Sequence, residues 1–155
     1  MIRLLRPGSG ESDRFLESAG SRPVSYPEVG STLGVLPAGY AVDRNRVDLG
    51  SGRDTWTRAV AALRAWRMFE LGWVEIRPAT PPIELHRTVA AVVRAMGVWF
   101  LNPCRIVAVV DEPRRFGFSY GTVDGHFERG EERFLVEWRP DDGVHVRHRD
   151  RLAEV

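Results

Sequence analysis

Apolar side chains recur at helical spacing in one stretch of this chain and at every second position in several others. The helical stripe consists of Trp56, Ala59, Val60, Leu63, Trp66 and Phe69. Residues three and four apart share one face of a helix, so this stripe predicts a helix over residues 56–69. Ser51 and Asp54 precede it at capping-box spacing, and Gly72 is a suitable stop. This helix is the clearest element of the sequence.

Alternating or continuous apolar runs predict strands before and after this helix. The predicted strands cover residues 39–49, 73–77, 88–96, 106–110, 116–122, 134–138 and 143–148. The apolar parity changes within the first strand, which predicts a bulge near Asn45. Residues 97–103 are expected to turn the chain. Residues 111–115 are expected to form a hairpin turn, because Pro113 lacks a donor and its neighbours are charged.

The predicted strand over residues 116–122 has two unlike faces. Phe116, Phe118 and Tyr120 alternate with Gly117, Ser119 and Gly121, so one face carries aromatic rings and the other is almost bare. A bare strand face allows another segment to pack closely, or leaves room for a ligand. Close packing is the more common reason for glycine in a strand.

The order of these elements predicts an α+β fold with a single domain over residues 1–155. Residues 1–10 are expected to be flexible, a short helix is predicted over residues 11–19, and residues 149–155 are expected to be a tail. Short connections favour antiparallel neighbours. We therefore expect a curved antiparallel sheet of about six to seven strands wrapped on one main helix.

Several motifs carry a resemblance to a known family. The run over residues 111–134, DEPRRFGFSYGTVDGHFERGEERF, resembles the signature of an uncharacterised bacterial and plant family catalogued as domain of unknown function nineteen-ninety. Residues 26–32, 36–40, 63–66 and 102–105 resemble its motifs too, so the resemblance covers about residues 12–148. Phe127 stands where the family usually has proline. The resemblance brings no activity with it.

The element order is also similar to that of the helix-grip fold, which START-like lipid-transfer proteins and small polyketide cyclases share. In such folds a C-terminal helix lies across the sheet and closes a cavity. This chain stops at Val155, where members of the resembled family usually continue into a long helix, so that helix is expected to be missing. The similarity concerns architecture, and a fold alone does not fix function.

Composition narrows the classes of function. The chain is 43% hydrophobic and 28% charged with a net charge of +1, so no global charge draws it to nucleic acid or to an anionic membrane. It has no lysine, which excludes a lysine Schiff base. A single cysteine, Cys104, excludes an intrachain disulfide and agrees with a cytoplasmic location. No apolar segment is long enough for a secretory signal or a membrane span. No cofactor motif is present, and none is expected.

The loop over residues 123–130 and the residues after it hold the most chemically suggestive cluster. His126, Glu128, Glu131 and Glu132 form the pattern H-x-E-x-x-E-E. A metal site is not expected, because the stretch has one histidine and glycine on both sides. It is either a solvated charged turn or a loop that orients His126. In the second case His126 is a candidate general base, because histidine titrates near neutral pH, and Glu128 could orient it.

We expect a cavity that binds a small apolar molecule, because binding sites combine apolar walls with a few placed polar groups. The candidate lining residues are Tyr40, Trp66, Trp99, Arg105, Tyr120 and His126. One alternative is a small cyclase or hydratase with His126 as base, Tyr120 as acid and Glu128 in support. Another is a protein-interaction domain. No nucleic-acid partner is expected, and the oligomeric state stays open.

Overall fold

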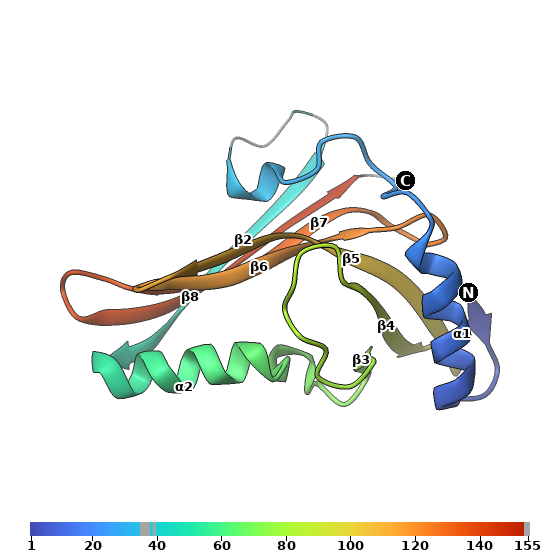
Figure 1. The fold of residues 1–155 in the computed structure, drawn as a ribbon, viewed down its shortest axis with the longest axis horizontal. Coiled ribbons are helices and arrows are strands. Elements are labelled where there is room, and N and C mark those ends of the chain that lie inside the picture. Colours follow the sequence, from blue (N-terminus) through green and yellow to red (C-terminus); the bar gives the residue numbers. More distant parts are fainter. Residues whose placement is uncertain (35–37, 39, 154–155) are drawn as a thin grey trace.

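One curved antiparallel sheet, with a helix against each of its faces, forms the fold (Figure 1). The structure is a computed structural model that describes residues 1–34, 38 and 40–153, with the backbone alone for residues 40 and 150–153. The helices are α1 (Ser9–Gly20) and α2 (Gly52–Arg64), with short 3₁₀ helices η1 (Ser31–Leu33) and η2 (Arg67–Phe69). The strands are β1 (Ile2–Arg3), β2 (Tyr40–Ser51), β3 (Val74–Arg77), β4 (Thr88–Ala95), β5 (Val98–Glu112), β6 (Arg115–Thr122), β7 (Arg129–Trp138) and β8 (Gly143–Ala153).

The sheet confirms the predicted α+β class. Its strands follow the order β2-β8-β7-β6-β5-β4-β3, and β1 pairs with β5 beside this path. Every pairing is antiparallel, as the short connections predicted. The long strand β5 pairs with β4 along its first half and with β6 along its second half. The comparison with helix-grip proteins is not confirmed and stays an analogy.

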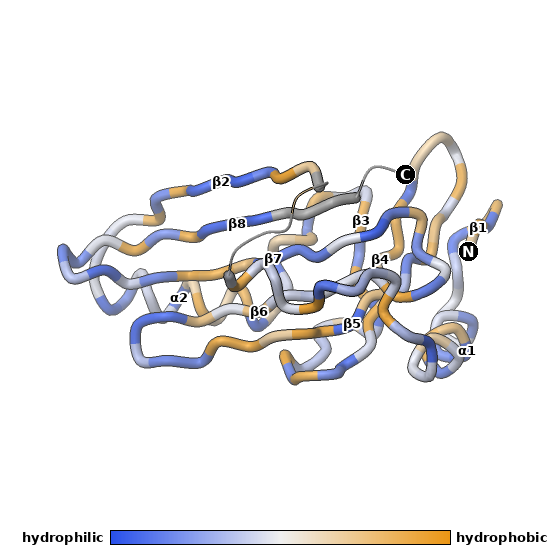
Figure 2. The backbone as a smooth tube through the Cα atoms, turned by 90° about the horizontal axis from the view of Figure 1, so that it is seen from above, coloured by the Kyte–Doolittle hydropathy of each residue, from blue (hydrophilic) through white to orange (hydrophobic). Residues whose placement is uncertain are grey.

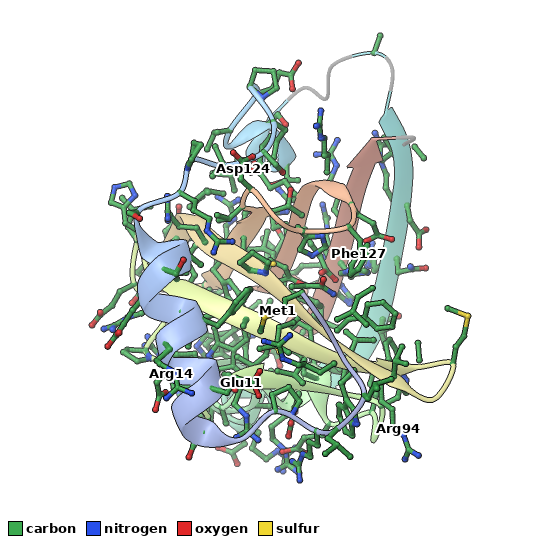
Figure 3. The ribbon with its side chains drawn as sticks, turned by 90° about the vertical axis from the view of Figure 1, so that its right-hand side faces the viewer. Met1, Glu11, Arg14, Arg94, Asp124 and Phe127 are labelled. Carbon is green, nitrogen blue, oxygen red and sulfur yellow. The ribbon has the colours of Figure 1, made fainter. Side chains whose placement is uncertain are left out.

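Two cores lie on opposite faces of the sheet, because the side chains of each strand alternate between them. The larger core packs α2 and η2 on Phe116, Phe118, Phe134 and Val136 of β6 and β7. The smaller core packs α1 on β4 and β5 around Phe15. Figure 3 shows α1, which carries Glu11 and Arg14, against that side of the sheet. The period-two pattern of the sequence therefore produces two differently covered faces.

The main helix is shorter than the apolar stripe predicted. It ends at Arg64, Trp66 takes a left-handed backbone conformation with φ 57°, and η2 follows. Trp66 is nonetheless buried, and its indole Nε1 donates to the carbonyl oxygen of Pro81 at 2.7 Å. The stripe continues across the helix end because Trp66 and Phe69 pack into the same core. Ser51 is the N-cap as predicted, but its side chain makes no capping hydrogen bond.

The turn predicted over residues 97–103 is wrong, because these residues belong to β5. The chain turns one step earlier, at Met96 and Gly97, which both have positive φ. Pro103 is tolerated within the strand for a geometric reason. Its carbonyl accepts from Val123 N–H, just beyond the end of β6, so its missing N–H also faces that side and removes no bond to β4.

Both ends of the described chain join the sheet, unlike the flexible start and the tail that the sequence suggested. The Met1 amino group donates to the carbonyl oxygen of Leu101 at 2.9 Å, and Ile2–Arg3 pair with β5. Strand β8 runs on to Ala153 and pairs with β2 and β7 over its length. The register shift of β2 lies between Asp48 and Gly50 instead of near Asn45.

The bare face of β6 is filled by the segment before β2, which confirms close packing at this strand. An added Cβ on Gly121 would lie 1.8 Å from Tyr26 Oη, and one on Gly117 would lie 2.2 Å from a backbone oxygen of β7. Ser119 hydrogen-bonds to the Thr32 hydroxyl at 2.8 Å. The absence of a side chain at Gly121 lets Tyr26 lie directly on the sheet, whereas Gly117 makes room for the adjacent strand β7.

The buried carboxylate of Glu131 fastens this segment. It accepts hydrogen bonds from Tyr26 Oη at 2.9 Å, from Gly30 N–H at 2.7 Å, and from Thr32 through both N–H at 3.0 Å and its hydroxyl. Glu131 is 1% exposed, so these donors replace the water that the charge has lost. The motif over residues 26–32 thus has a structural role: it supplies the donors that satisfy this carboxylate.

Candidate functional site

A cavity of about 350 Å³ lies on the α2 face of the sheet, between the η2–β3 segment and strands β4 to β8. Its apolar wall comes from the η2–β3 segment and from strands β4 and β7. It consists of Met68, Phe69, Leu71, Trp73, Val74, Ala91, Val93 and Phe134. Leu71 and Trp73 are more than half exposed, so they stand at the open side of the cavity. The cavity exists because α2 ends at Arg64 and the chain turns away before it reaches β4 and β5.

Polar groups gather on the sheet side of the same cavity. They come from Asn102, Cys104, Tyr120, Thr122, His126, Glu128, Gly130, Glu131, Glu132 and His148. The carboxylate of Glu131 points to the opposite face of the sheet, where it binds Tyr26 and Thr32. The neighbouring Glu132 points toward the cavity, because consecutive strand residues alternate. One apolar wall and one polar wall therefore face each other.

Glu132 links three strands at the polar wall. One carboxylate oxygen accepts the phenol hydrogen of Tyr120, and the other is hydrogen-bonded to His148 Nε2. The cross-strand register explains this, because Tyr120 lies opposite Glu132 and His148 lies opposite Phe134. The His148 ring also stacks on Phe134 with centroids 4.7 Å apart. These side chains form a connected, partly buried network that can hold or exchange a proton.

Strand β5 adds an amide and a thiol to the polar wall. Asn102 is 9% exposed, and its Oδ1 is buried without a hydrogen-bond partner among the described residues. A buried carbonyl oxygen that accepts no hydrogen bond costs free energy, so this amide is suited to a donor from a ligand. Burial, helped by the negative charge of Glu132, raises the pKa of the Cys104 thiol well above its ordinary value. Cys104 is therefore a protonated, unreactive thiol.

His126 approaches the cavity from the loop after β6. Its Nδ1 accepts a hydrogen bond from Glu128 N–H at 2.9 Å, which places the proton of the neutral ring on Nε2. Burial lowers the pKa of His126 to about 4. A ring with this pKa and an occupied Nδ1 lone pair is a poor general base at neutral pH. It is a hydrogen-bond donor through Nε2.

This pKa predicts a specific pH dependence of stability. The unfolded chain protonates His126 near pH 6.5, and the folded chain does so only near pH 4. Unfolding therefore takes up a proton between these values, and the free energy of unfolding falls as the pH falls through this window, by about 3 kcal/mol at most. A His126→Asn variant keeps an acceptor for Glu128 N–H and does not titrate. We expect its urea-unfolding free energy to lose this part of the pH dependence.

His86 provides the matched control for that prediction. It is exposed and has positive φ, which asparagine tolerates well, so His86→Asn removes an imidazole ring that is not buried. Its pH profile of unfolding should follow the wild type. An NMR titration in which the His126 ring protonates near its ordinary pKa of 6.5 would contradict the buried neutral form.

The structure brings only part of the predicted site together. Tyr120, His126 and Glu128 line the cavity. Trp66 lies in the core beneath η2, and Trp99 lies on the α1 side of the sheet. Three further hydrogen bonds hold Arg105 against Thr88 and the end of α1, away from the cavity. The side chain of Tyr40 lies outside the described residues, so its candidate role stays a prediction.

Three polar residues of the cavity had no role in the sequence-based site. Glu132 was part of the H-x-E-x-x-E-E pattern, and its parity with Phe134 could have placed it on the apolar face of the strand. His148 was assigned to the end of the last strand, and Asn102 to a turn. Neither residue carries a local signal of its place, because their positions depend on pairing between strands far apart in the sequence.

Two negative findings concern the described residues. Within them, no group of three or more histidine, cysteine, aspartate or glutamate side chains is arranged to hold a metal ion. Across the same part of the chain, none of the helices has the length and apolar character that a membrane crossing requires.

Comparisons with known proteins place the chain among uncharacterised relatives. A model of the family described as a domain of unknown function (DUF1990) matches residues 25–149. A UPF0548 protein of Deinococcus radiodurans is 40% identical over 150 residues, which cover 88% of this chain and 75% of that protein. UPF0548 proteins of Dictyostelium discoideum and Arabidopsis thaliana are 39% and 34% identical over 111 and 106 residues. Those matches cover 68% and 64% of this chain.

The chain spans about half the length of the amoebal and plant relatives, 51% in each case. Among solved structures, a hypothetical protein of Helicobacter pylori is similar in fold, with a TM-score of 0.55 and 12% sequence identity. The similarity covers 86% of this chain and 79% of that one. At this identity the likeness concerns the fold alone.

Proposed function

The chain belongs to the DUF1990 family, whose description names no activity, and we propose that it binds a small, largely apolar molecule in the cavity beneath η2. A single observation carries the proposal: an apolar wall faces a polar wall across about 350 Å³, the size range of small-molecule sites. The homologues in bacteria, an amoeba and a plant add no ligand to this picture.

The polar wall defines the chemistry of the ligand's other end. Asn102 Oδ1 and the carboxylate of Glu132 are acceptors, and both favour a ligand group that donates hydrogen bonds. His126 supplies the complementary donor through Nε2. The fitting molecule is therefore mainly hydrocarbon or aromatic and carries a hydroxyl or amine at one end. The apolar wall contributes affinity, and the polar groups fix the orientation.

Filling the cavity should weaken binding strongly without unfolding the protein. Val93 lies on the apolar wall at a partly buried position of β4, so Val93→Trp places a large ring in the space a ligand would occupy. Nile red is a suitable probe because it is apolar and uncharged. We expect it to fluoresce with the wild type, and its affinity to fall at least about tenfold in Val93→Trp.

Val47→Trp is the matched control for this experiment. Val47 lies on β2, is 54% exposed and lines no described pocket, so the same substitution there leaves the cavity unchanged. Its Nile red affinity should equal that of the wild type. Equal binding by wild type and Val93→Trp, with both variants folded by circular dichroism, would place the dye elsewhere and remove support for the cavity.

One observation favours a second function, an acid–base reaction at the same cavity. Tyr120, Glu132 and His148 are already hydrogen-bonded, so a proton could pass between a bound molecule and this network. Glu132, in place of His126, is then the central group, because the low pKa of His126 leaves it a weak base. Incubating the wild type and Glu132→Gln with a molecule released from the cavity would test this. Conversion by the wild type alone supports an enzyme, and unchanged mass with both supports binding only.

A further inference from the structure

Five arginines gather on the face of the sheet that α2 leaves uncovered. The strand register sets them in two adjacent rows: Arg133, Arg149 and Arg44 lie opposite one another across β7, β8 and β2, and Arg147 lies opposite Arg46. They line an open hollow of about 310 Å³. Figure 2 shows hydrophilic positions along β2 and β8. The chain as a whole has a net charge of only +1, so this concentration is local.

The charges of this arginine cluster are only partly compensated by the described residues. Glu137 pairs with Arg147 at 2.7 Å and with Arg115 at 3.6 Å, so one carboxylate serves two guanidinium groups. Asp48 lies 3.9 Å from Arg46 at an exposed position. The nearby carboxylate of Glu131 is already occupied by Tyr26, Gly30 and Thr32. The cluster therefore has more positive than negative charges. Like charges directly opposite each other in a sheet are destabilising, so a bound anion would relieve this repulsion.

Among the partly buried arginines of the cluster, Arg133 is the residue whose positive charge is least compensated by the contacts described. It is partly buried between Ser119 and Arg149 in the cross-strand row, and its Nε is buried without a hydrogen-bond partner among the described residues. Burial, followed by the positive charge of Arg149, lowers the pKa of Arg133. A buried guanidinium donor normally has an acceptor, and the oxygen of a bound anion is a group that would satisfy it.

The loop that follows Tyr26 fixes one side of the hollow. Arg149 Nη1 donates to the carbonyl oxygens of Thr32 at 3.1 Å and Gly34 at 3.2 Å, which holds this guanidinium in a defined place. In Figure 1 the segment with η1 lies on the opposite side of the sheet from α2. The cluster is therefore partly preorganised, and the cost of ordering its side chains on binding is reduced.

We propose that the arginine cluster is a binding site for a phosphate-bearing anion, distinct from the cavity beneath η2. The guanidinium fork matches phosphate oxygens, and two rows of arginines can contact more than one phosphoryl group. The residues that line the described hollow include no Phe, Tyr or Trp, and the ring of His148 among them is stacked on Phe134, so the hollow offers no large platform for stacking a nucleobase. The phosphate can belong to a small dissolved molecule or to a lipid headgroup.

Isothermal titration with inorganic pyrophosphate at fixed ionic strength tests the site. The wild type should bind, and Arg133→Gln should lose roughly tenfold or more in affinity, because it removes a charge-assisted contact. Arg58→Gln is the matched control. Arg58 is exposed on α2 and outside the cluster, and the substitution removes the same net charge. Equal losses in the two variants, or none in Arg133→Gln, would overturn the proposal.

Thermal unfolding supplies an independent readout. Without ligand, Arg133→Gln should unfold at the same or a higher temperature than the wild type, since it relieves repulsion from Arg149. Pyrophosphate should raise the unfolding temperature of the wild type and of Arg58→Gln, and at the same concentration should raise that of Arg133→Gln much less. A pyrophosphate-induced increase in Arg133→Gln as large as that of the wild type contradicts the site.

A vesicle co-sedimentation experiment distinguishes a lipid headgroup from a dissolved phosphate compound as the source of the phosphate. Phosphatidylcholine vesicles with and without phosphatidic acid are sedimented with the wild type and Arg133→Gln. Co-sedimentation that needs both phosphatidic acid and Arg133 identifies a headgroup, whereas pyrophosphate binding without co-sedimentation identifies a dissolved phosphate compound. If neither probe binds in an Arg133-dependent way, the proposal is wrong.

Discussion

Replacing Glu131 by alanine is expected to lower the free energy of unfolding by about 4 kcal/mol. The substitution removes the acceptor of a phenol, two backbone N–H groups and a hydroxyl, of which all but the Gly30 N–H are buried. These donors then stay buried without partners, and that loss exceeds the gain from no longer burying a charge. For a chain of this length the unfolding temperature should fall by roughly 10 °C.

Glu128→Ala is the control for this prediction. Glu128 lies three positions before Glu131, is exposed, and contributes only its backbone N–H to the contact with His126. Its replacement should change the free energy of unfolding by no more than about 0.5 kcal/mol. Urea unfolding of both variants measures the difference. A Glu131→Ala protein as stable as Glu128→Ala would show that the carboxylate does not anchor residues 26–32.

Gly121→Ala should be the second strongly destabilising substitution, at about 3 kcal/mol. The new methyl group would lie 1.8 Å from Tyr26 Oη and 2.6 Å from its Cζ, so the ring must move. Tyr26 is 4% exposed and donates to Glu131, so its displacement also breaks a buried hydrogen bond. Gly20→Ala is the control, because a Cβ there meets nothing within 4 Å.

A double-mutant cycle separates this clash from a general intolerance of the strand. In a Tyr26→Ala background the space beside Gly121 is empty, and adding Gly121→Ala should cost little more than Tyr26→Ala alone. The coupling energy between the two positions should then be close to the whole effect of Gly121→Ala. If the full cost persists without the tyrosine ring, residues 26–32 are not what fills the bare face of β6.

Local patterns predicted most of the strands, because alternation reports directly which strand faces are apolar. The contrast between Phe118 and Gly121 also indicated which face of β6 another segment could approach. Three elements differed where a local preference met a tertiary constraint. Trp66 adopts a left-handed conformation that its place in an apolar stripe does not reveal. Pro103 suggested the end of a strand, but it lies within β5 at a position where its missing N–H removes no hydrogen bond to β4. The charged residues of β8 read as a tail but pair with β2.

The candidate site was less accessible to sequence reasoning than the fold. Glu131 and Glu132 are adjacent and chemically identical, yet one fastens a loop on one face and the other lines a cavity on the opposite face. Which face holds a ligand depends on where α2 ends and on how residues 26–32 return to the sheet. His126 illustrates the same limit, because its value as a base depends on burial that no spacing encodes.

The two proposed sites are separate because the side chains of β7 and β8 alternate between the two faces of the sheet. Glu132 and Phe134 face the cavity, Arg133, Arg147 and Arg149 face the arginine cluster, and His148 borders both. The two sites lie on opposite faces of the sheet and have only His148 in common among their described lining residues, so an apolar molecule and a phosphate-bearing anion could occupy the protein together. A variant of one site should leave binding at the other unchanged, which allows each proposal to fail alone.

Native mass spectrometry, on protein purified without detergent and then unfolded for extraction, tests binding in the cavity most directly. Wild type and Val93→Trp are compared before and after incubation with a lipid extract. The account predicts that the wild type carries a discrete additional mass that is released on unfolding, and that Val93→Trp does not. If both proteins show the bare chain mass even after the incubation, or if both carry the same additional mass, the cavity beneath η2 is not a binding site.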